Sequence, residues 1–245
     1  MTEYPLPGGF INGPVRVGDT VRRPLGARGE FVHRLLDRFE RMGWSGAPRV
    51  LGVDERQREM LTFVEGQVPW QSPRSPDVDS VASLVAVARL VREFHDLTAG
   101  TDLAGEHEAV CHNDLSPKNT VYREQPDGLR PVAFIDWDLA APGARVHDLA
   151  LVCWQFLDLG PTVPDAAVAG ERMRAIADAY GFADRPVLLD TVVWWQDRCW
   201  RGIEAGASAG DAALVRLRDQ GVVREVRAAR EWVERHRHEL DAAMS

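Results

Sequence analysis

The stretch VCHNDLSPKNTVY, residues 110–122, decides the fold class of this 245-residue chain. It carries His112, Asp114 and Asn119 in the order His-x-Asp, four residues, Asn. Apolar residues at both ends of the stretch predict short strands, so the polar residues fall in the loop between them. A His-x-Asp pattern alone is a weak signal, and it gains weight only when a second motif accompanies it.

A second polar group comes after the apolar stretch VAFI at residues 132–135. Here a predicted strand delivers two carboxylates, Asp136 and Asp138, into a turn. Two such motifs at this separation, between strands and after a long helix, form a specific pattern. The competing interpretation, in which these Asp and Asn residues only form turns and cap helices, is the weaker one.

Phosphoryl transfer explains this set of side chains, because its catalysis is mostly alignment of the reactants and neutralisation of phosphate charge. Asp114 is the expected base, which takes the proton of a substrate hydroxyl. Asn119 and Asp136 offer the oxygen ligands that magnesium prefers. His112 is expected to orient the loop rather than to react. Asp138 is either a second metal ligand or a carboxylate just outside the metal's coordination sphere.

Three motifs resemble those of the aminoglycoside phosphotransferase and choline kinase superfamily, which is related to the protein kinases. They are HNDLSPKN at residues 112–119, IDWD at 135–138 and VHDLA at 146–150. In that family, the Asp of the third motif, here Asp148, opens the next helix and steadies the catalytic loop. Asp-Trp-Asp stands where protein kinases have Asp-Phe-Gly, so the resemblance favours kinases of small molecules.

The resemblance implies a two-lobed, protein-kinase-like α+β fold. Its reduced N-terminal β lobe is expected to span residues 1–64 and to bind the nucleotide. The larger, mainly helical lobe, residues 65–245, would carry the catalytic and metal-binding loops and the acceptor pocket. The hydrophobic patterns agree with this division. They predict strands at 15–17, 20–23, 49–53 and 59–64, and helices at 30–42, 78–97, 148–159, 164–180, 187–205 and 211–243.

The family grips the nucleotide phosphates with a lysine on the third strand, and this chain lacks one there. Its single lysine is Lys118, beside the catalytic motif. The matching strand offers Arg22 and Arg23 instead. Counting back from the proline that ends the strand favours Arg22, with Arg23 as the alternative. Arginine binds phosphate through two nitrogens but is longer and planar, so it is not an equal substitute. Glu30, in the first turn of the next helix, is the candidate partner for this arginine.

Other nucleotide contacts are implied by the resemblance alone. The backbone of Phe63, Val64 and Glu65 would meet the nucleotide base. The glycine-containing stretch GGFING at residues 8–13 either lies over the phosphates or forms a simple turn, because it lacks the full G-x-G-x-x-G pattern. Lys118 either touches the γ-phosphate or faces solvent.

Composition narrows the functional classes. The formal net charge is -8, which disfavours a broad nucleic-acid surface, because neutralising phosphates needs clustered basic residues. The three cysteines, Cys111, Cys153 and Cys199, are widely spaced and include no C-x-x-C pair. That favours a reducing compartment and disfavours a disulfide framework or a zinc site. No apolar stretch reaches the roughly 20 residues that span a bilayer, so a cytoplasmic enzyme without a membrane partner is expected.

The sequence says least about which residues would bind the acceptor. Trp194, Trp195 and Trp200 fall in one predicted helix, with Asp190 and Asp197 nearby. Aromatic walls with acidic residues suit an amphipathic or cationic acceptor. Core packing at helical spacing explains the same tryptophans and is the favoured interpretation.

The sequence therefore predicts a phosphotransferase that uses magnesium and moves the γ-phosphoryl group of ATP or GTP to a hydroxyl of a small molecule. An aminoglycoside is one candidate acceptor. The alternatives are a metabolic kinase for choline, a sugar or a hydroxylated amino acid, and a catalytically silent binding module on a kinase scaffold. The sequence indicates no oligomeric state.

Overall fold

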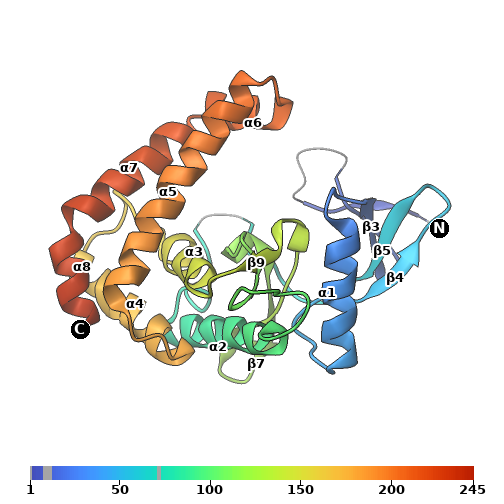
Figure 1. Cartoon of the computed structure of the whole chain (residues 1–245), viewed down its shortest axis with the longest axis horizontal. Coiled ribbons are helices and arrows are strands. Elements are labelled where there is room, and N and C mark those ends of the chain that lie inside the picture. Colours follow the sequence, from blue (N-terminus) through green and yellow to red (C-terminus); the bar gives the residue numbers. More distant parts are fainter. Residues whose placement is uncertain (1, 8–12, 71–72) are drawn as a thin grey trace.

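The computed structural model describes residues 2–7, 13–70 and 73–245. A small sheet with one helix lies at one end of the molecule, and a larger helical body lies at the other (Figure 1). The sheet is antiparallel and five-stranded, in the order β1-β2-β3-β5-β4. Its strands are β1 (Tyr4–Pro5), β2 (Val15–Val17), β3 (Thr20–Pro24), β4 (Val50–Val53) and β5 (Arg58–Thr62).

Helix α1 (Gly29–Arg41) joins the sheet to the rest of the core. Its apolar residues recur at helical spacing, so Val32, Leu35, Leu36 and Phe39 are all buried. The ring of Phe39 lies 5.2 Å from that of Trp137, which belongs to the second motif. Packing between the two lobes thus begins next to the predicted site.

The helical lobe is built around α2 (Val81–Thr98). Ser80 caps the N-terminus of this helix, because its side chain accepts a hydrogen bond from the Ser83 backbone N–H. Its buried stripe faces the largest hydrophobic cluster of the chain. The other helices of this lobe are α3 (Val146–Phe156), α4 (Ala166–Tyr180), α5 (Arg185–Ser208), α6 (Ala212–Asp219), α7 (Val222–Arg235) and α8 (Arg237–Met244).

Short strands between α2 and α3 carry the predicted motifs. Strand β6 (Ala109–Cys111) pairs with β9 (Ala141–Gly143), and β7 (Thr120–Gln125) pairs with β8 (Gly128–Phe134). The two motifs come directly after the ends of β6 and β8, and each includes one 3₁₀ turn, Pro117–Asn119 and Trp137–Leu139. Because Thr120, at the start of β7, pairs with Phe134, at the end of β8, the two motifs come together at the open end of this hairpin.

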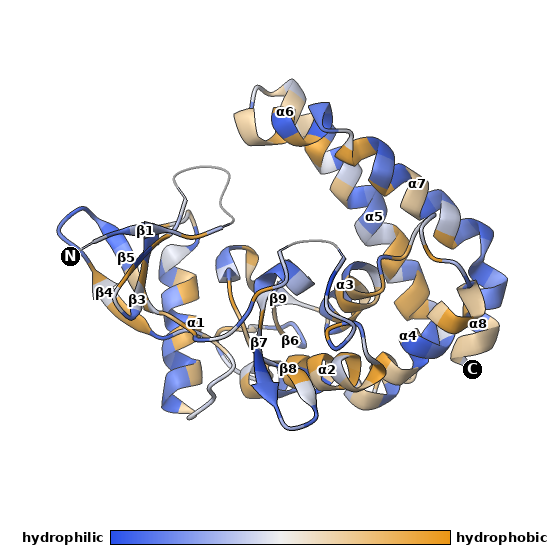
Figure 2. Cartoon of the chain, turned by 180° about the vertical axis from the view of Figure 1, so that it is seen from behind, coloured by the Kyte–Doolittle hydropathy of each residue, from blue (hydrophilic) through white to orange (hydrophobic). Residues whose placement is uncertain are grey.

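The C-terminal region differs from the prediction. Residues 211–243 were expected to form one helix, and they form α6, α7 and α8 instead. Gly221 lies at φ 88°, a left-handed conformation that ends α6 and that glycine adopts without strain. Helices α5, α6 and α7 form an arm that extends away from the body (Figure 1). Hydrophobic and hydrophilic residues are interspersed along α7 (Figure 2). Its buried residues recur at helical spacing, namely Val223, Val226, Ala229, Trp232 and Val233.

The division into lobes agrees with the predicted α+β fold, while the boundary between residues 64 and 65 stays a prediction. Most of the glycine stretch at residues 8–13 lies outside the described residues. Among the described helices, none combines the length and the apolar character needed to cross a bilayer. The predicted cytoplasmic location stays a prediction.

Candidate active site

The loop after β6 is held by the carboxylate of Asp148, near the start of α3. Asp148 Oδ2 accepts a hydrogen bond from the backbone N–H of His112 at 2.6 Å, and Oδ1 accepts one from that of Asn113 at 2.8 Å. Asn113 has φ 63°, a left-handed conformation that asparagine tolerates better than most residues. A helix terminus therefore fixes the sharp turn that precedes Asp114.

Asp148 is fully buried and has a second supporting partner. His95 Nε2 donates to Asp148 Oδ2 at 3.1 Å, and His95 Nδ1 lies 2.8 Å from the hydroxyl of Tyr180. Burial favours the neutral acid, but the hydrogen bond and charge of His95, together with His112 and the Asn113 N–H, hold the pKa of Asp148 below its ordinary value. Asp148 thus acts as a buried anion that organises the loop.

His112 uses both ring nitrogens inside the protein. Its Nδ1 lies 3.3 Å from the backbone nitrogen of Asp114, and its Nε2 lies 3.0 Å from the carbonyl oxygen of Ile135. A backbone N–H can only donate and a carbonyl can only accept, so the tautomer with the proton on Nε2 satisfies both bonds. This geometry supports an orienting role for His112, since it links the first motif to the second.

Asp114 and Asn119 are in direct contact. Asn119 Nδ2 donates to the backbone oxygen of Asp114 and to its Oδ2, both at 2.8 Å. Both bonds use the amide nitrogen, so within the described part of the chain the carbonyl oxygen of the Asn119 side chain remains available as a ligand. Burial raises the pKa of Asp114, and neighbouring positive groups only partly offset this effect. A carboxylate with a raised pKa is a better proton acceptor.

The second motif lies beside the first. The backbone N–H of Ile135 donates to the backbone carbonyl of Asn119 at 2.9 Å, and the charge of Asp136 contributes to the raised pKa of Asp114. Asp136 has φ 64°, which turns the chain as β8 ends. Asp136 and Asp138 keep 48% and 45% of their side-chain surface exposed, so a ligand can reach both.

Arg23 connects the sheet to this motif. Its NH1 lies 2.7 Å from Asp136 Oδ1, and its NH2 lies 2.5 Å from Asp138 Oδ1. Its Nε donates to Glu59 Oε1 on β5 at 2.6 Å. Burial disfavours the charged guanidinium, but the three carboxylates outweigh this effect and raise the pKa of Arg23.

Of the two arginines, Arg23, the alternative in the sequence prediction, lies next to the motif residues, and contact of either one with phosphate stays a prediction. Side chains alternate across a strand, so Arg22 and Arg23 project from opposite faces of the sheet. Arg22 NH1 lies 3.4 Å from Asp54 Oδ2, away from the motif residues, whereas Arg23 reaches them. Glu30 is exposed and Glu59 pairs with Arg23 in its place. The signal that could have found Glu59 is the strand register, in which it stands directly opposite Arg23.

Comparisons with known proteins show what the sequence and the fold resemble. Residues 101–188 match the family described as "Phosphotransferase enzyme family". The structure is similar to a mutant of aminoglycoside 2'-phosphotransferase-IIIa in complex with GDP, with a TM-score of 0.63 and 14% identity over 93% of this chain and 91% of that one. It is similar to a choline/ethanolamine kinase family protein from Mesorhizobium loti, with a TM-score of 0.62 and 16% identity over 100% and 93%.

The resemblance expected from the motifs is thus confirmed, because the chain is similar to aminoglycoside phosphotransferases and to a choline/ethanolamine kinase family protein. These similar structures share its two-lobed, kinase-like fold, which confirms the predicted fold class. A further relative is the trifolitoxin immunity protein of Rhizobium leguminosarum bv. trifolii. It is 28% identical over 277 aligned positions, which cover 99% of each chain.

The segment expected to meet the base in this superfamily comes after β5. The Phe63 N–H donates to the Asp19 carbonyl at 2.8 Å, and the Glu65 carbonyl accepts from Arg123 Nε at 2.8 Å. Arg16 lies 3.7 Å from the centre of the Phe63 ring and also pairs with Glu65. Within the described residues, no hydrogen bond involves the backbone of Val64. Contact with a base stays a prediction for all three residues.

Two residues from different elements interact electrostatically with Asp114, the expected base. Lys118 is exposed, and its charge lowers the pKa of Asp114, which places it near the expected base. Cys199 belongs to α5. Burial raises the pKa of its thiol, and the charge of Asp114 raises it further. The thiol of Cys199 therefore lies within range of the charge of Asp114.

Of the two interpretations of the α5 tryptophans, core packing fits Trp195, and an aromatic wall for an acceptor needs an exposed ring such as that of Trp194. Trp195 donates its indole N–H to the His147 carbonyl at 2.9 Å and packs against the core. Trp194 keeps 45% of its surface exposed, beside His147. Asp190 pairs with Arg237, and Asp197 lies 2.6 Å from Arg201, so both predicted acidic residues already have basic partners. The ring of Trp200 lies close to the guanidinium groups of Arg201 and Arg227.

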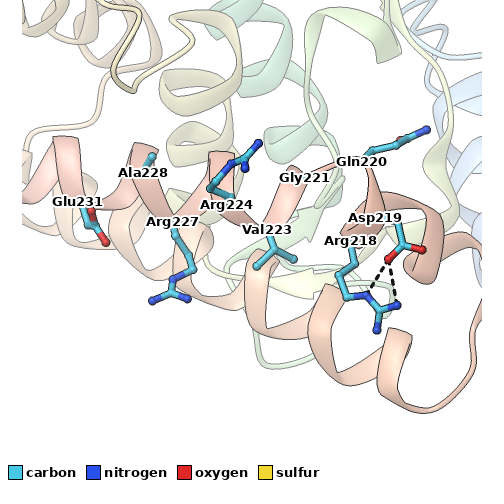
Figure 3. A pocket seen from close by; sticks show the side chains of 9 residues that line it. All are labelled: Arg218, Asp219, Gln220, Gly221, Val223, Arg224, Arg227, Ala228 and Glu231. Atoms are coloured by element: carbon cyan, nitrogen blue, oxygen red, sulfur yellow. Dashed lines mark hydrogen bonds and ion pairs between the residues drawn. The ribbon is translucent and has the colours of Figure 1, made fainter.

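A separate pocket lies on the arm, where α6 turns into α7 (Figure 3). Its wall includes Arg218, Arg224 and Arg227, and Arg218 pairs with the neighbouring Asp219. None of the residues that line it belongs to the catalytic motifs. We therefore place the candidate site at the motif residues and Arg23, not in this pocket.

Proposed function

We propose that the chain is a small-molecule kinase that transfers the γ-phosphoryl group of ATP or GTP to a hydroxyl group. The observation that carries this proposal is the convergence of Asp114, Asn119 and Asp136 from two loops, opposite the single guanidinium of Arg23. This set combines a proton acceptor, oxygen ligands and a cation for phosphate. Those are the parts that phosphoryl transfer needs.

The hydroxyl oxygen of the acceptor would attack the γ-phosphorus, and the bond from that phosphorus to the β–γ bridging oxygen would break. Asp114 would accept the hydroxyl proton. Its Oδ2 is held by Asn119, and its raised pKa favours proton uptake. His112 and Asp148 would keep the loop in position without touching either substrate.

The donor set fits magnesium. Asn119 presents a carbonyl oxygen, and Asp136 and Asp138 present half-exposed carboxylates, which are the hard oxygen ligands this ion prefers. When bound, the ion would neutralise phosphate charge. Asn119 and Asp136 are the proposed ligands, and Asp138 is the third candidate.

The acceptor is proposed as a hydroxylated small molecule. An aminoglycoside is one candidate, because one structure of similar fold is that of an aminoglycoside phosphotransferase from Streptomyces rimosus in complex with ADP and streptomycin. It has a TM-score of 0.57 and 16% identity over 79% of this chain and 90% of that one. Choline, sugars and hydroxylated amino acids remain the alternatives. A silent binding module is disfavoured, because Arg23 occupies the place expected for the missing lysine.

Nucleotide binding with the metal is the first test. At a nucleotide concentration 100 times Kd, binding adds about 2.7 kcal/mol to the free energy of unfolding, which raises Tm by roughly 5–10 °C for a chain of this size. We expect this shift with magnesium and ATP or GTP together. Asp136→Asn should lose most of it, and Asp127→Asn, at an exposed loop carboxylate, should keep it. An equal shift in Asp136→Asn would contradict the metal-ligand role, and no shift in the wild type would favour the binding module.

The acceptor side can be tested at Cys199 of α5, whose thiol pKa is raised by burial and, further, by the charge of Asp114. Cys199→Trp should raise the KM for the acceptor by roughly tenfold or more, because a small displacement near the reacting atoms is costly. The nucleotide Kd should stay unchanged. An acceptor screen that monitors ADP or GDP release supplies the substrate for this measurement. Unchanged acceptor kinetics would place the acceptor elsewhere.

A further inference from the structure

Arg23 forms hydrogen bonds with three carboxylates, and one of these carboxylates is far more buried than the other two. Glu59, which binds Nε, is 1% exposed, whereas Asp136 and Asp138, which bind the terminal nitrogens, are about half exposed. Arg23 and Glu59 stand directly opposite each other in the pairing of β3 with β5. The Glu59 contact is therefore built into the sheet, and the two aspartate contacts reach across to the other lobe.

The second oxygen of Glu59 is also occupied. His33 Nε2, from α1, lies 2.7 Å from Glu59 Oε2, while Arg23 Nε takes Oε1. Each oxygen of the Glu59 carboxylate thus has a partner. Helix α1 is therefore linked to Arg23 through His33 and Glu59. Glu30, the acidic residue of the first turn of α1, is exposed and does not pair with Arg23.

We propose that Glu59 and His33 are positioning residues that hold Arg23 by its Nε, so that NH1 and NH2 can leave Asp136 and Asp138 and bind the nucleotide phosphates. This inference rests on the proposed kinase function. It assigns the phosphate-binding cation to Arg23, and it assigns the orientation of that cation to Glu59 and His33.

The shape of the guanidinium supports this division. Its five N–H groups lie in one plane, so fixing Nε on a rigid partner fixes the direction of NH1 and NH2. A buried, hydrogen-bonded ion pair is costly to break, whereas half-exposed pairs exchange more easily. The Glu59 contact should therefore persist when phosphate oxygens replace the two aspartates. Those aspartates are then free for a metal ion.

A lysine could not meet both demands. Its ammonium is a single charged point on a flexible stem, so it cannot keep one nitrogen on Glu59 while offering two others to phosphate. Arg23→Lys should therefore weaken nucleotide binding although it preserves the charge.

The test measures the Kd of ATP and of GTP with magnesium by calorimetry, on the whole chain. Glu59→Gln should raise the Kd of the nucleotide that the wild type binds by about tenfold or more, since it removes a charge-assisted hydrogen bond to Arg23. His33→Leu should act in the same direction, and His33→Gln, whose amide can donate to Glu59, should restore most of the affinity. Glu30→Gln is the matched control on α1 and should leave Kd unchanged.

A rescue experiment separates positioning from general stability. Arg23→Ala should regain nucleotide affinity when guanidinium ion is added at a concentration that leaves the wild type unaffected. The same ion should not rescue Arg23→Ala/Glu59→Gln, because its binding partner is gone. A structural loss of fold would respond to the ion in neither variant.

The outcomes distinguish this inference from the function on which it rests. If the wild type binds no nucleotide, the proposed function fails. If the wild type binds and both Glu59→Gln and His33→Leu bind equally well, only the positioning inference is overturned. Should Glu59→Gln lose its fold, the pair His33→Leu and His33→Gln decides the question, because His33 is partly exposed and easier to replace.

Discussion

Replacing Asp114 by asparagine is expected to lower kcat by about 10²–10⁴-fold, the usual contribution of a general base. The amide cannot take the proton of the acceptor hydroxyl. Its carbonyl can still accept the hydrogen bond from Asn119 Nδ2, so the loop should keep its shape. The measurement is the release of ADP or GDP in the presence of the identified acceptor.

Two readouts keep this result specific. The nucleotide Kd of Asp114→Asn should stay close to the wild-type value, because Asp114 is not among the expected phosphate contacts. Asp127→Asn, at an exposed position, should leave kcat unchanged. Turnover that survives in Asp114→Asn would remove this residue from the role of base and would leave the loop with only a binding function.

Replacing Asp148 by alanine is expected to lower the free energy of unfolding by about 3–5 kcal/mol, the cost of breaking a buried charged pair. The change strands the backbone N–H groups of His112 and Asn113 and the Nε2 of His95 in the core. Urea denaturation measures the effect. Asp96→Ala, which removes a half-exposed carboxylate on the same α2 helix as His95, should cost much less.

The effect of Asp148 should depend on pH in a direction set by its lowered pKa. Because the folded state holds the carboxylate charged, its stabilising contribution is fully present above the ordinary pKa of 3.8. It is lost as the pH falls through the lower pKa of the folded state. The difference in stability between wild type and Asp148→Asn should therefore be greatest above about pH 4 and should shrink in more acidic solution. A difference that grows on acidification would contradict the lowered pKa.

The sequence was sufficient for the local parts of the site. The order of polar residues in residues 112–119 and 135–138 is set by the strand ends, and the structure brings these residues together. Their relation to Asp148 was implied by the resemblance, and its carboxylate does accept hydrogen bonds from the backbone of the loop that precedes Asp114. These features depend on contacts within or between neighbouring short elements, which motif spacing constrains.

Contacts between residues that are far apart in the sequence could not be predicted from the sequence. Whether Arg22 or Arg23 faces the motif residues depends on how β3 pairs with β5, and a shift of one residue would exchange their faces. The contact of Arg23 with Glu59 depends on the same register, whereas the resemblance points to a glutamate on the helix. The long helix expected over residues 211–243 failed at Gly221, because periodicity continues across a turn that only the backbone conformation marks.

Three formal negative charges, on Glu59, Asp136 and Asp138, surround the single positive charge of Arg23. Together these four side chains carry two surplus negative charges, which is the amount that one divalent ion cancels. A bare triphosphate would be repelled from this cluster, whereas its magnesium complex would meet less repulsion. We therefore expect the nucleotide to bind together with its metal ion rather than before it. Binding of the free nucleotide should depend strongly on ionic strength.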